Sequence, residues 1–371
     1  MSVSDKMEIL LVTVPGLEEL LRAEAVENGF KKPEVTYGGV TIRGYWSDVW
    51  RANLTLRGAS RVLVRLGAFR VTHLAKLDQF AHEFPWEQTF NAGAHIRVEA
   101  SCKKSKIYHK KAAAERFEKA LVDRIGAVID SEAELFLKIR IVKDICTISI
   151  DSSGEGLHKR GIKQALNRAP LRETLAALML RQSGFRGKEP VIDPMCGSGT
   201  LVLEAAEIAT RQLAGRARSF AFQHLNTFDP DEFQAMKERH NIGETDQHFY
   251  GFDRDRGAIS RAEENAERGS VSDVTTFAER TISDLRPPSD MAGLLITNPP
   301  YGTRIGDQKK LTPLYQKLGH VAMERFKGWR VGILTNSDKL AAATGLPFKK
   351  DPLGFSHGGI RVHYYQTDPL E

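Results

Sequence analysis

The sequence predicts an α/β fold: a parallel sheet with helices on both faces in the C-terminal half, preceded by an α+β region. From Glu189 onward, short apolar segments typical of strands alternate regularly with segments of helical periodicity. Before Ser153 the two patterns are mixed in no fixed order. The chain has 371 residues, 41% of them hydrophobic, which is enough for two domains of ordinary size.

The elements of the N-terminal region follow from the spacing of their apolar residues. The helix over 111–129 is the clearest, because Phe117, Leu121 and Ile125 recur at helical spacing. The expected order is strand 8–14, helix 16–28, strand 39–43, strand 61–69, strand 95–101, helix 111–129, strand 135–140 and strand 144–151. This irregular order is typical of an α+β domain.

A loop and a helix separate this region from the regular one. The loop is Ser152-Ser153-Gly154-Glu155-Gly156, and the helix is expected from Leu171, since a proline such as Pro170 is tolerated at the start of a helix. The expected order afterwards is strand 191–192, a glycine-rich turn, helix 200–212, strand 249–252, helix 256–268, strand 275–278, strand 294–296, helix 314–326 and strand 331–334. The segment 214–249 interrupts the alternation and is expected to be an inserted loop and helix.

The most informative motif is Asn298-Pro299-Pro300-Tyr301, which follows a short apolar strand. The side-chain carbonyl of Asn298 and the main-chain carbonyl of Pro299 are acceptors, and the two prolines remove competing N–H donors. The ring of Tyr301 offers a face for stacking. This set suits a planar NH2 group on a π-system, and the alternative is an ordinary turn after a buried strand. We predict that these four residues are catalytic.

A glycine-rich turn precedes this motif, at Asp193-Pro194-Met195-Cys196-Gly197-Ser198-Gly199-Thr200. Gly197 and Gly199 let the main chain approach a ligand closely. The turn is not typical of a diphosphate site, because Val202 replaces the third glycine of a dinucleotide fingerprint and no Gly-Lys-Ser/Thr follows.

Three acidic residues lie at successive strand ends: Asp193, Asp253 and Asp284. A carboxylate at the position of Asp253 accepts hydrogen bonds from ribose hydroxyls in sheets of this type, and Asp284 could accept from an adenine amino group. Each acid alone could be a loop residue or a helix cap. Together with the glycine turn, they favour a nucleoside site without a diphosphate.

The net charge is +6, with a pI near 9.1, and the positive charge is clustered. Arginines gather between Arg51 and Arg70, and five lysines lie in 101–111, in both cases without an acidic residue. Two such clusters in one region favour a phosphate-binding face over a plain solvated surface.

The three cysteines, Cys102, Cys146 and Cys196, have no spacing typical of a metal site or a disulfide framework, so we expect no metal and a reducing compartment. Cys196 as a nucleophile is the less favoured alternative to a small turn residue. The first 21 residues lack the apolar core of a signal peptide, and no stretch approaches the roughly 18 apolar residues that span a bilayer. We expect a cytoplasmic protein with no membrane partner.

The segments 193–200, 251–253 and 298–301, with Asp284, together resemble class I S-adenosylmethionine-dependent methyltransferases that act on amines. Further segments are similar to bacterial THUMP-domain guanine-N2 RNA methyltransferases, above all those of large-subunit ribosomal RNA; they are 106–109, 158–161, 169–176, 301–307, 329–330 and 334–335. The sequence departs from this family at Ile162, where relatives have an aromatic residue, and at Lys163, where many have arginine.

The resemblance implies a fold and a domain order. It implies a Rossmann-like class I methyltransferase domain at 189–371, a ferredoxin-like part at 1–60, a THUMP RNA-binding domain at 61–153, and a linker with a cofactor-lid helix at 154–188. Some relatives carry a second methyltransferase domain, and because this chain stops at Glu371 we expect no second activity.

The resemblance also implies a cofactor, a partner and a reaction. The cofactor is S-adenosylmethionine, bound by Pro170, Asp193, Met195, Cys196, Gly197, Ser198, Gly199, Thr200, Asp253, Asp284 and Asn298. The partner is RNA, contacted by Lys103, Lys104, Lys106, His109, Lys110 and Arg160. The reaction is methyl transfer to N2 of a guanine in 23S ribosomal RNA, by a monomer or weak dimer. Guanine-N2 methylation of transfer RNA, adenine-N6 or protein glutamine methylation, and a non-catalytic ribosome-assembly factor remain alternatives.

Overall fold

The computed structural model describes residues 6–163, 171–302, 305–357 and 359–371. They form two compact units. Unit 1 contains the described residues up to Thr13, with Leu21–Leu157 and Gly215–His240; unit 2 contains those of Val14–Leu20, His158–Ala214 and Asn241–Glu371. The predicted domains are consecutive ranges, but two short segments do not follow that order. Val14–Leu20 belongs to unit 2, and Gly215–His240 belongs to unit 1.

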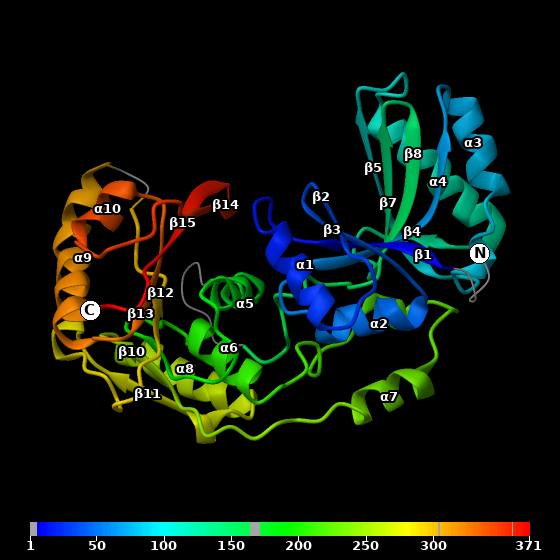
Figure 1. Cartoon of the computed structure of the whole chain (residues 1–371). Coiled ribbons are helices and arrows are strands. Elements are labelled where there is room, and N and C mark those ends of the chain that lie inside the picture. The colour runs from blue at the N-terminus through cyan, green and yellow to red at the C-terminus, as the bar shows by residue number, and fades with distance from the viewer. Residues whose placement is uncertain (1–5, 164–170, 303–304, 358) are drawn as a thin grey trace. The chain divides into compact units, whose positions relative to one another are not determined.

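Unit 1 is built on one eight-stranded sheet with the order β2-β3-β1-β4-β8-β7-β5-β6 (Figure 1). Its strands are β1 (Met7–Val12), β2 (Glu34–Thr36), β3 (Gly39–Gly44), β4 (Arg61–Arg70), β5 (His95–Lys103), β6 (Val128–Ile129), β7 (Leu135–Val142) and β8 (Ile145–Asp151). The pairs are antiparallel except where β5 meets β6 and β7. Alternate residues of β4, β7 and β8, such as Val64, Ile139 and Ile148, are buried, which is the period-2 pattern of a sheet covered on one face.

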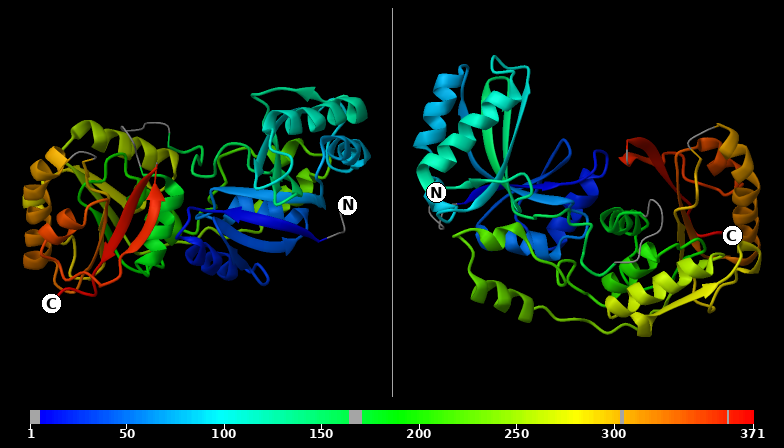
Figure 2. Two further views of the ribbon diagram at one scale, coloured as in Figure 1. Left: turned by 90° about the horizontal axis from the view of Figure 1, so that it is seen from above. Right: turned by 180° about the vertical axis from the view of Figure 1, so that it is seen from behind.

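The α-helices of unit 1 are α1 (Glu18–Glu27), whose first residues belong to unit 2, α2 (Trp46–Thr55), α3 (Leu74–Glu83), α4 (Lys110–Ile125) and α7 (Pro230–Glu238). Two of them, α2 and α3, were not predicted from the sequence. The helices α3 and α4 lie side by side against the part of the sheet that contains β5, β7 and β8 (Figures 1 and 2). The prediction of helix to residue 129 was wrong at its end, because Gly126 adopts a left-handed conformation with φ of 64° and caps α4.

The inserted segment Gly215–His240 contributes an aromatic cluster to unit 1. Phe222 stacks on Phe220 with ring centroids 5.0 Å apart, and Phe228 meets Trp50 edge-on at 5.5 Å. The main chain is also tied to unit 1: Gly215 N donates to Leu54 O and Phe222 N donates to Ser152 O. The predicted loop and helix are therefore present, and the helix is α7.

Unit 2 is a seven-stranded sheet with the order β11-β10-β9-β12-β13-β15-β14. The strands are β9 (Val191–Asp193), β10 (Phe249–Asp253), β11 (Thr275–Glu279), β12 (Leu294–Thr297), β13 (Arg330–Thr335), β14 (Leu353–His357) and β15 (Ile360–Gln366). The five strands from β11 to β13 are parallel, and β15 runs antiparallel to both of its neighbours. The α/β fold with a parallel sheet is confirmed, and β14 and β15 are additions that were not predicted.

Helices cover both faces of the sheet in unit 2 (Figure 1). The helices are α5 (Glu173–Gln182), α6 (Thr200–Ala209), α8 (Arg256–Arg268), α9 (Ile305–Arg325) and α10 (Asp338–Ala343). One apolar core lies between the sheet and α5, α6 and α8, and a second lies under α9 and α10. The helix expected from residue 314 begins at Ile305 and continues through Pro313. Among the described residues, no helix is both long and apolar enough to cross a membrane.

Candidate active site

The predicted site residues gather at one edge of the sheet in unit 2. The strands β9, β10 and β12 are parallel neighbours, so the residues at or just after their carboxyl ends lie at the same edge. These residues are Asp193, Asp253 and Asn298. This is the edge at which parallel α/β sheets bind ligands.

The glycine-rich turn after β9 is held by hydrogen bonds to two strand ends. Cys196 N donates to Phe252 O at 2.9 Å, Gly197 N donates to Asp253 Oδ2 at 2.9 Å, and Met195 N donates to Asp193 Oδ1 at 3.1 Å. The turn is thereby fixed before any ligand arrives.

Glycine is required at Gly199, which caps α6 with φ of 86°. A Cβ atom there would lie 3.1 Å from both Ala262 Cβ and Phe277 Cε1, so a side chain would strain the backbone and push these neighbours aside. The ring of Phe277 and the helix α8 therefore support the turn from behind.

Cys196 packs inside the turn and is not placed as a nucleophile. Its side chain is buried, and a Cβ atom on Gly251 would lie 3.1 Å from its sulfur. Burial raises the pKa of the Cys196 thiol well above its usual range, which disfavours the thiolate that a nucleophile needs.

The three acidic residues differ in environment. Asp193 is almost fully buried, and this burial raises the pKa of its carboxyl to about 7. Asp253 is half-buried and accepts from the main-chain N–H groups of Gly197 and Asp255. A carboxylate has about four lone-pair sites, so Asp253 keeps capacity for ribose hydroxyls. Asp284 is exposed and accepts from the Thr281 hydroxyl at 2.6 Å.

The Asn298 side chain carries an unsatisfied acceptor. Its Oδ1 atom is buried and has no hydrogen-bond partner among the residues that the structure describes. A buried acceptor without a donor costs about 1–3 kcal/mol, which a ligand amine at this position would recover. The catalytic role of Asn298 stays a prediction.

The residues after Asn298 are held by packing. Pro299 is buried, and Tyr315 from α9 donates its hydroxyl to Pro300 O at 3.3 Å. Tyr301 is half-buried and contacts both apolar cores of unit 2, and this burial raises the pKa of its phenol. The ring is therefore a neutral, fixed surface.

One residue near this edge, Asn336, was missed by the sequence analysis, and the contacts of another, Lys163, were not predicted. Asn336 follows β13, the neighbour of β12, and its Oδ1 atom is also buried without a partner in the described part of the chain. Lys163 donates to Thr200 Oγ1 at 2.6 Å and pairs with Glu173 at 3.3 Å. A polar residue directly after a predicted buried strand was the available signal for Asn336.

The prediction that Arg160 contacts RNA was wrong. Arg160 is 4% exposed and pairs with two buried carboxylates of α6, Glu204 at 3.1 Å and Glu207 at 3.9 Å. A guanidinium enclosed by protein carboxylates cannot reach a phosphate. It instead fastens the segment before α5 to the helix that follows the glycine turn.

The other predicted RNA contacts lie at the surface. Lys103, Lys104, Lys106, His109 and Lys110 are all exposed, between the end of β5 and the start of α4. Their role stays a prediction, and Pro170 lies outside the described residues. Within the described ranges, no group of three or more His, Cys, Asp or Glu side chains is arranged to hold a metal ion.

Three family models match this chain, in order along it. The RlmL ferredoxin-like domain matches residues 8–63, the THUMP domain residues 71–151, and the RMKL-like methyltransferase domain residues 160–358.

Curated and solved proteins agree with these matches. The Ribosomal RNA large subunit methyltransferase K/L of Psychromonas ingrahamii is 33% identical over 92% of this chain and 47% of its own length. This chain thus spans about half the length of the curated relatives it matches. A "possible methylase" from Clostridium difficile 630 has a TM-score of 0.88, 26% identity and 99% coverage of both chains. The crystal structure of SMU.472 complexed with SAH has a TM-score of 0.87, also with 26% identity and 99% coverage of both chains.

The predicted family is confirmed by the model that matches 160–358, more than half of the chain, and by the two domains that precede it. The protein belongs to the family with an RMKL-like methyltransferase domain, carried behind a ferredoxin-like domain and a THUMP domain.

Proposed function

We propose that this chain is an S-adenosylmethionine-dependent RNA methyltransferase that methylates N2 of a guanine in large-subunit ribosomal RNA. The observation that carries the proposal is the buried Oδ1 of Asn298, which has no partner among the described residues and lies at the ligand-binding edge of the sheet. The family match supports the reaction class, and the names of the curated relatives support ribosomal RNA as the substrate.

The residues at this edge fit S-adenosylmethionine. Gly197 and Gly199 leave two positions of the turn without side chains, and Asp253 retains lone pairs for ribose hydroxyls. The buried carboxyl of Asp193 gains a counter-charge when a cationic ligand approaches, which favours its ionised form. When bound, S-adenosylmethionine supplies an electrophilic methyl group on a positively charged sulfur.

The protein's part in the reaction is to make a poor nucleophile reactive. The lone pair of guanine N2 is conjugated into the ring. Asn298 Oδ1 and the Pro299 carbonyl accept hydrogen bonds from the two N–H groups of this amine and turn its lone pair out of the ring plane. Positive charge develops on N2 during transfer, and two acceptors fixed in advance stabilise it. The excess proton then leaves N2 for solvent.

Tyr301 positions the base. A guanine must leave its stack to reach a site at a sheet edge, and an aromatic face compensates for the lost stacking. Because Tyr301 is wedged between two cores, its ring stays oriented for this contact. Holding the base in line with the methyl donor supplies a further part of the rate enhancement.

The test is nucleoside mass spectrometry after incubation of the chain with isotope-labelled S-adenosylmethionine and unmodified large-subunit ribosomal RNA. We expect labelled N2-methylguanosine. Labelled N6-methyladenosine would refute the choice of base, and stronger labelling of transfer RNA would refute the choice of RNA. No labelled nucleoside, together with no heat of S-adenosylmethionine binding by calorimetry, would favour the assembly-factor alternative.

A further inference from the structure

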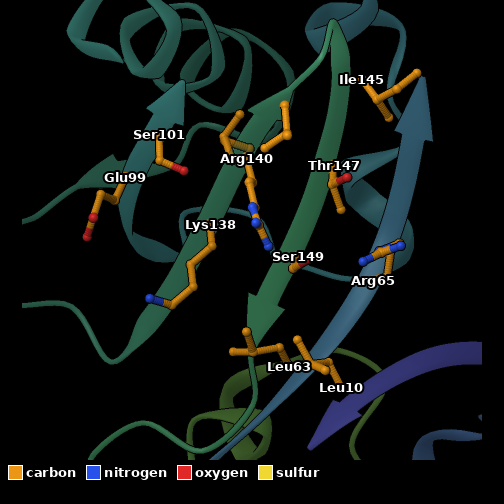
Figure 3. Close-up of a pocket in the computed structure, with 12 residues that line it drawn as sticks. Leu10, Leu63, Arg65, Glu99, Ser101, Lys138, Arg140, Ile145, Thr147 and Ser149 are labelled. Atoms are coloured by element: carbon orange, nitrogen blue, oxygen red, sulfur yellow. The ribbon is translucent and has the colours of Figure 1, made fainter. Parts of the chain in front are cut away.

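Unit 1 has a hollow of about 300 Å³ on one face of its sheet (Figure 3). The side chains that line it come from β4, β5, β7 and β8, with Leu10 from β1 at one end. Most of them alternate with buried residues of the same strands, such as Ile141 and Ile148, so they lie on the opposite face from that apolar layer.

Strand register gathers three cations around one hydroxyl. Ser149 of β8 lies opposite Arg65 of β4 on one side and opposite Lys138 of β7 on the other. Arg140 is two residues along from Lys138 and therefore on the same face. Because β8 lies between β4 and β7, Arg65 and Lys138 are two strand spacings apart, roughly 10 Å, which leaves room for one anion between their long side chains. Figure 3 shows Ser149 between Arg65 and the two β7 side chains.

Two of these cations have unmet capacity. Arg65 pairs with Glu8 through Nη1 at 2.8 Å, but its Nε is buried and has no hydrogen-bond partner among the described residues. The Lys138 ammonium lies over the Phe136 ring, 3.8 Å from its centroid, and burial lowers the pKa of this amine. An anion in the hollow would satisfy the Arg65 donor and offset the desolvation of Lys138.

Two acidic residues flank the cations in the same row, and Asp151, two residues along β8 from Ser149, is paired with Arg61. Glu8 of β1 lies opposite Arg65, and Glu99 of β5 lies opposite Lys138, so the row reads acid, cation, hydroxyl, cation, acid. Ser101 and Thr147 stand on either side of Arg140 in the next row and add hydroxyls. A centre of three cations and three hydroxyls between two carboxylates matches a phosphodiester group, whose charge is concentrated at one point.

The hollow offers little for reading bases. The residues that line it include no aromatic side chain, and its apolar members at the two ends, among them Leu10, Leu63 and Ile145, are aliphatic. Platforms that stack bases are built mainly from aromatic rings, whereas backbone contact needs only charge and donors. The site therefore suits the backbone of a strand and is indifferent to its sequence.

We propose that this face binds a backbone phosphodiester of the substrate RNA, with Arg65, Lys138 and Arg140 as the cations and the Ser149 hydroxyl as a donor. The identity of the partner rests on the proposed function. The site is distinct from the exposed lysines of 103–110, which follow β5 outside the hollow.

The test compares the full chain with a triple variant, Arg65→Gln, Lys138→Gln and Arg140→Gln. The control triple variant, Lys31→Gln, Lys76→Gln and Lys119→Gln, removes the same charge from exposed positions elsewhere in unit 1. The probe is a fluorescein-labelled single-stranded RNA of roughly 12 nucleotides, titrated by anisotropy from about 50 to about 200 mM salt.

We expect the site variant to bind at least about tenfold more weakly than wild type at low salt, with a salt slope reduced by about 0.7, the value for one lost phosphate contact on a single strand. The control variant should change far less. Equal affinities and slopes for the two variants would overturn the proposal. If the triple variant does not fold, the single variants Arg140→Gln and Ser149→Ala replace it, because an exposed arginine and a neutral serine can be changed with little effect on folding. Wild-type RNA affinity in both single variants would also overturn the proposal.

Two further arms separate the alternatives. Millimolar inorganic phosphate at constant ionic strength should leave RNA binding intact; displacement of RNA from wild type but not from the site variant would assign the hollow to a free anion instead. If wild type yields no methylated nucleoside while the site variant still loses RNA affinity, the proposed function fails and this site stands. If wild type methylates RNA and the site variant binds and methylates equally well, this site alone fails.

Discussion

At the end of β12, the fold buries the side-chain oxygen of Asn298 without supplying it a donor from the described residues. We expect Asn298→Ala to lower kcat about 10²- to 10³-fold, the usual cost of removing one group fixed in advance for the transition state. Asn298→Asp retains an acceptor at the same place and should lose less. Kinetics on ribosomal RNA measures both. Calorimetry with S-adenosylmethionine is the control, and near-normal turnover of the alanine variant with intact cofactor binding would contradict the mechanism.

The buried carboxyl of Asp193 makes the binding of a cationic cofactor depend on pH. Its pKa of about 7 means that the carboxyl is largely protonated at pH 6 and ionised at pH 8. If the cation binds only the ionised form, S-adenosylmethionine should bind about tenfold more weakly at pH 6 than at pH 8. Titration calorimetry at the two values measures this. Asp193→Asn should abolish the dependence, and a dependence that persists in this variant would assign it to another group.

In the cofactor-free protein, the raised pKa of Asp193 has the opposite effect, because the stability of the fold decreases as pH rises. The folded state binds the Asp193 proton more tightly than the unfolded state, so this residue's contribution to stability falls as pH rises from about 4 to about 7 and is level above that. The cofactor reverses this loss, because it binds the form that the empty fold disfavours.

Local patterns marked the candidate site but did not show which of its side chains would be buried. The turn at 193–200 and the motif at 298–301 stand out in the sequence because glycines and prolines constrain the backbone. Arg160 was misassigned because its partners, Glu204 and Glu207, belong to a helix that otherwise reads as apolar. Two acidic residues in such a helix were the available signal for a buried cation.

At the level of elements, the spacing of apolar residues predicted the bounds of a helix well where capping residues mark the same ends. The helix α8 has the predicted bounds, because Asp255 caps it at Gly257 N and Gly269 follows its last residue. The predicted start at residue 314 was wrong, because α9 begins at Ile305 and continues through Pro313. The strands β14 and β15 were missed because their pairing lies outside the alternating strand–helix pattern.

The docking of the segment around Arg160 onto α6 is testable as a contact between elements. Arg160→Met should destabilise unit 2 by about 3–5 kcal/mol, because it leaves Glu204 and Glu207 buried without their cation. Lys188→Met, at an exposed position of the same unit, is the matched control and should change stability by less than about 0.5 kcal/mol.

Scanning calorimetry measures this effect without averaging over the two units. The transition that S-adenosylmethionine raises belongs to unit 2, since ligand binding stabilises the fold that binds it. A large downward shift confined to that transition is the expected result. Equal melting of the two variants would show that Arg160 contributes nothing to the attachment of its segment.

At the scale of the whole chain, the two units are separate in structure but not in sequence. Unit 2 contains Val14–Leu20 from near the N-terminus, and unit 1 contains Gly215–His240 from within the methyltransferase region. Sequence patterns report local conformation, so they identified 214–249 as an insertion. They could not show where it packs, because its partner Trp50 lies far away in the chain.

This exchange predicts that the N-terminal region is incomplete when it is cut at its apparent boundary. A fragment of residues 1–157 lacks Phe220, Phe222 and Phe233, each at most 4% exposed in the structure. Burying a side chain of this size contributes about 1.5–3 kcal/mol, so the fragment should melt well below the intact unit and expose Trp50. A synthetic peptide of 215–240 added in trans should raise its melting temperature and shift its tryptophan fluorescence to shorter wavelength. A peptide with Phe222→Ser and Phe233→Ser should do neither. If the fragment melts at the same temperature with and without the native peptide, the inserted segment is not part of the core of unit 1.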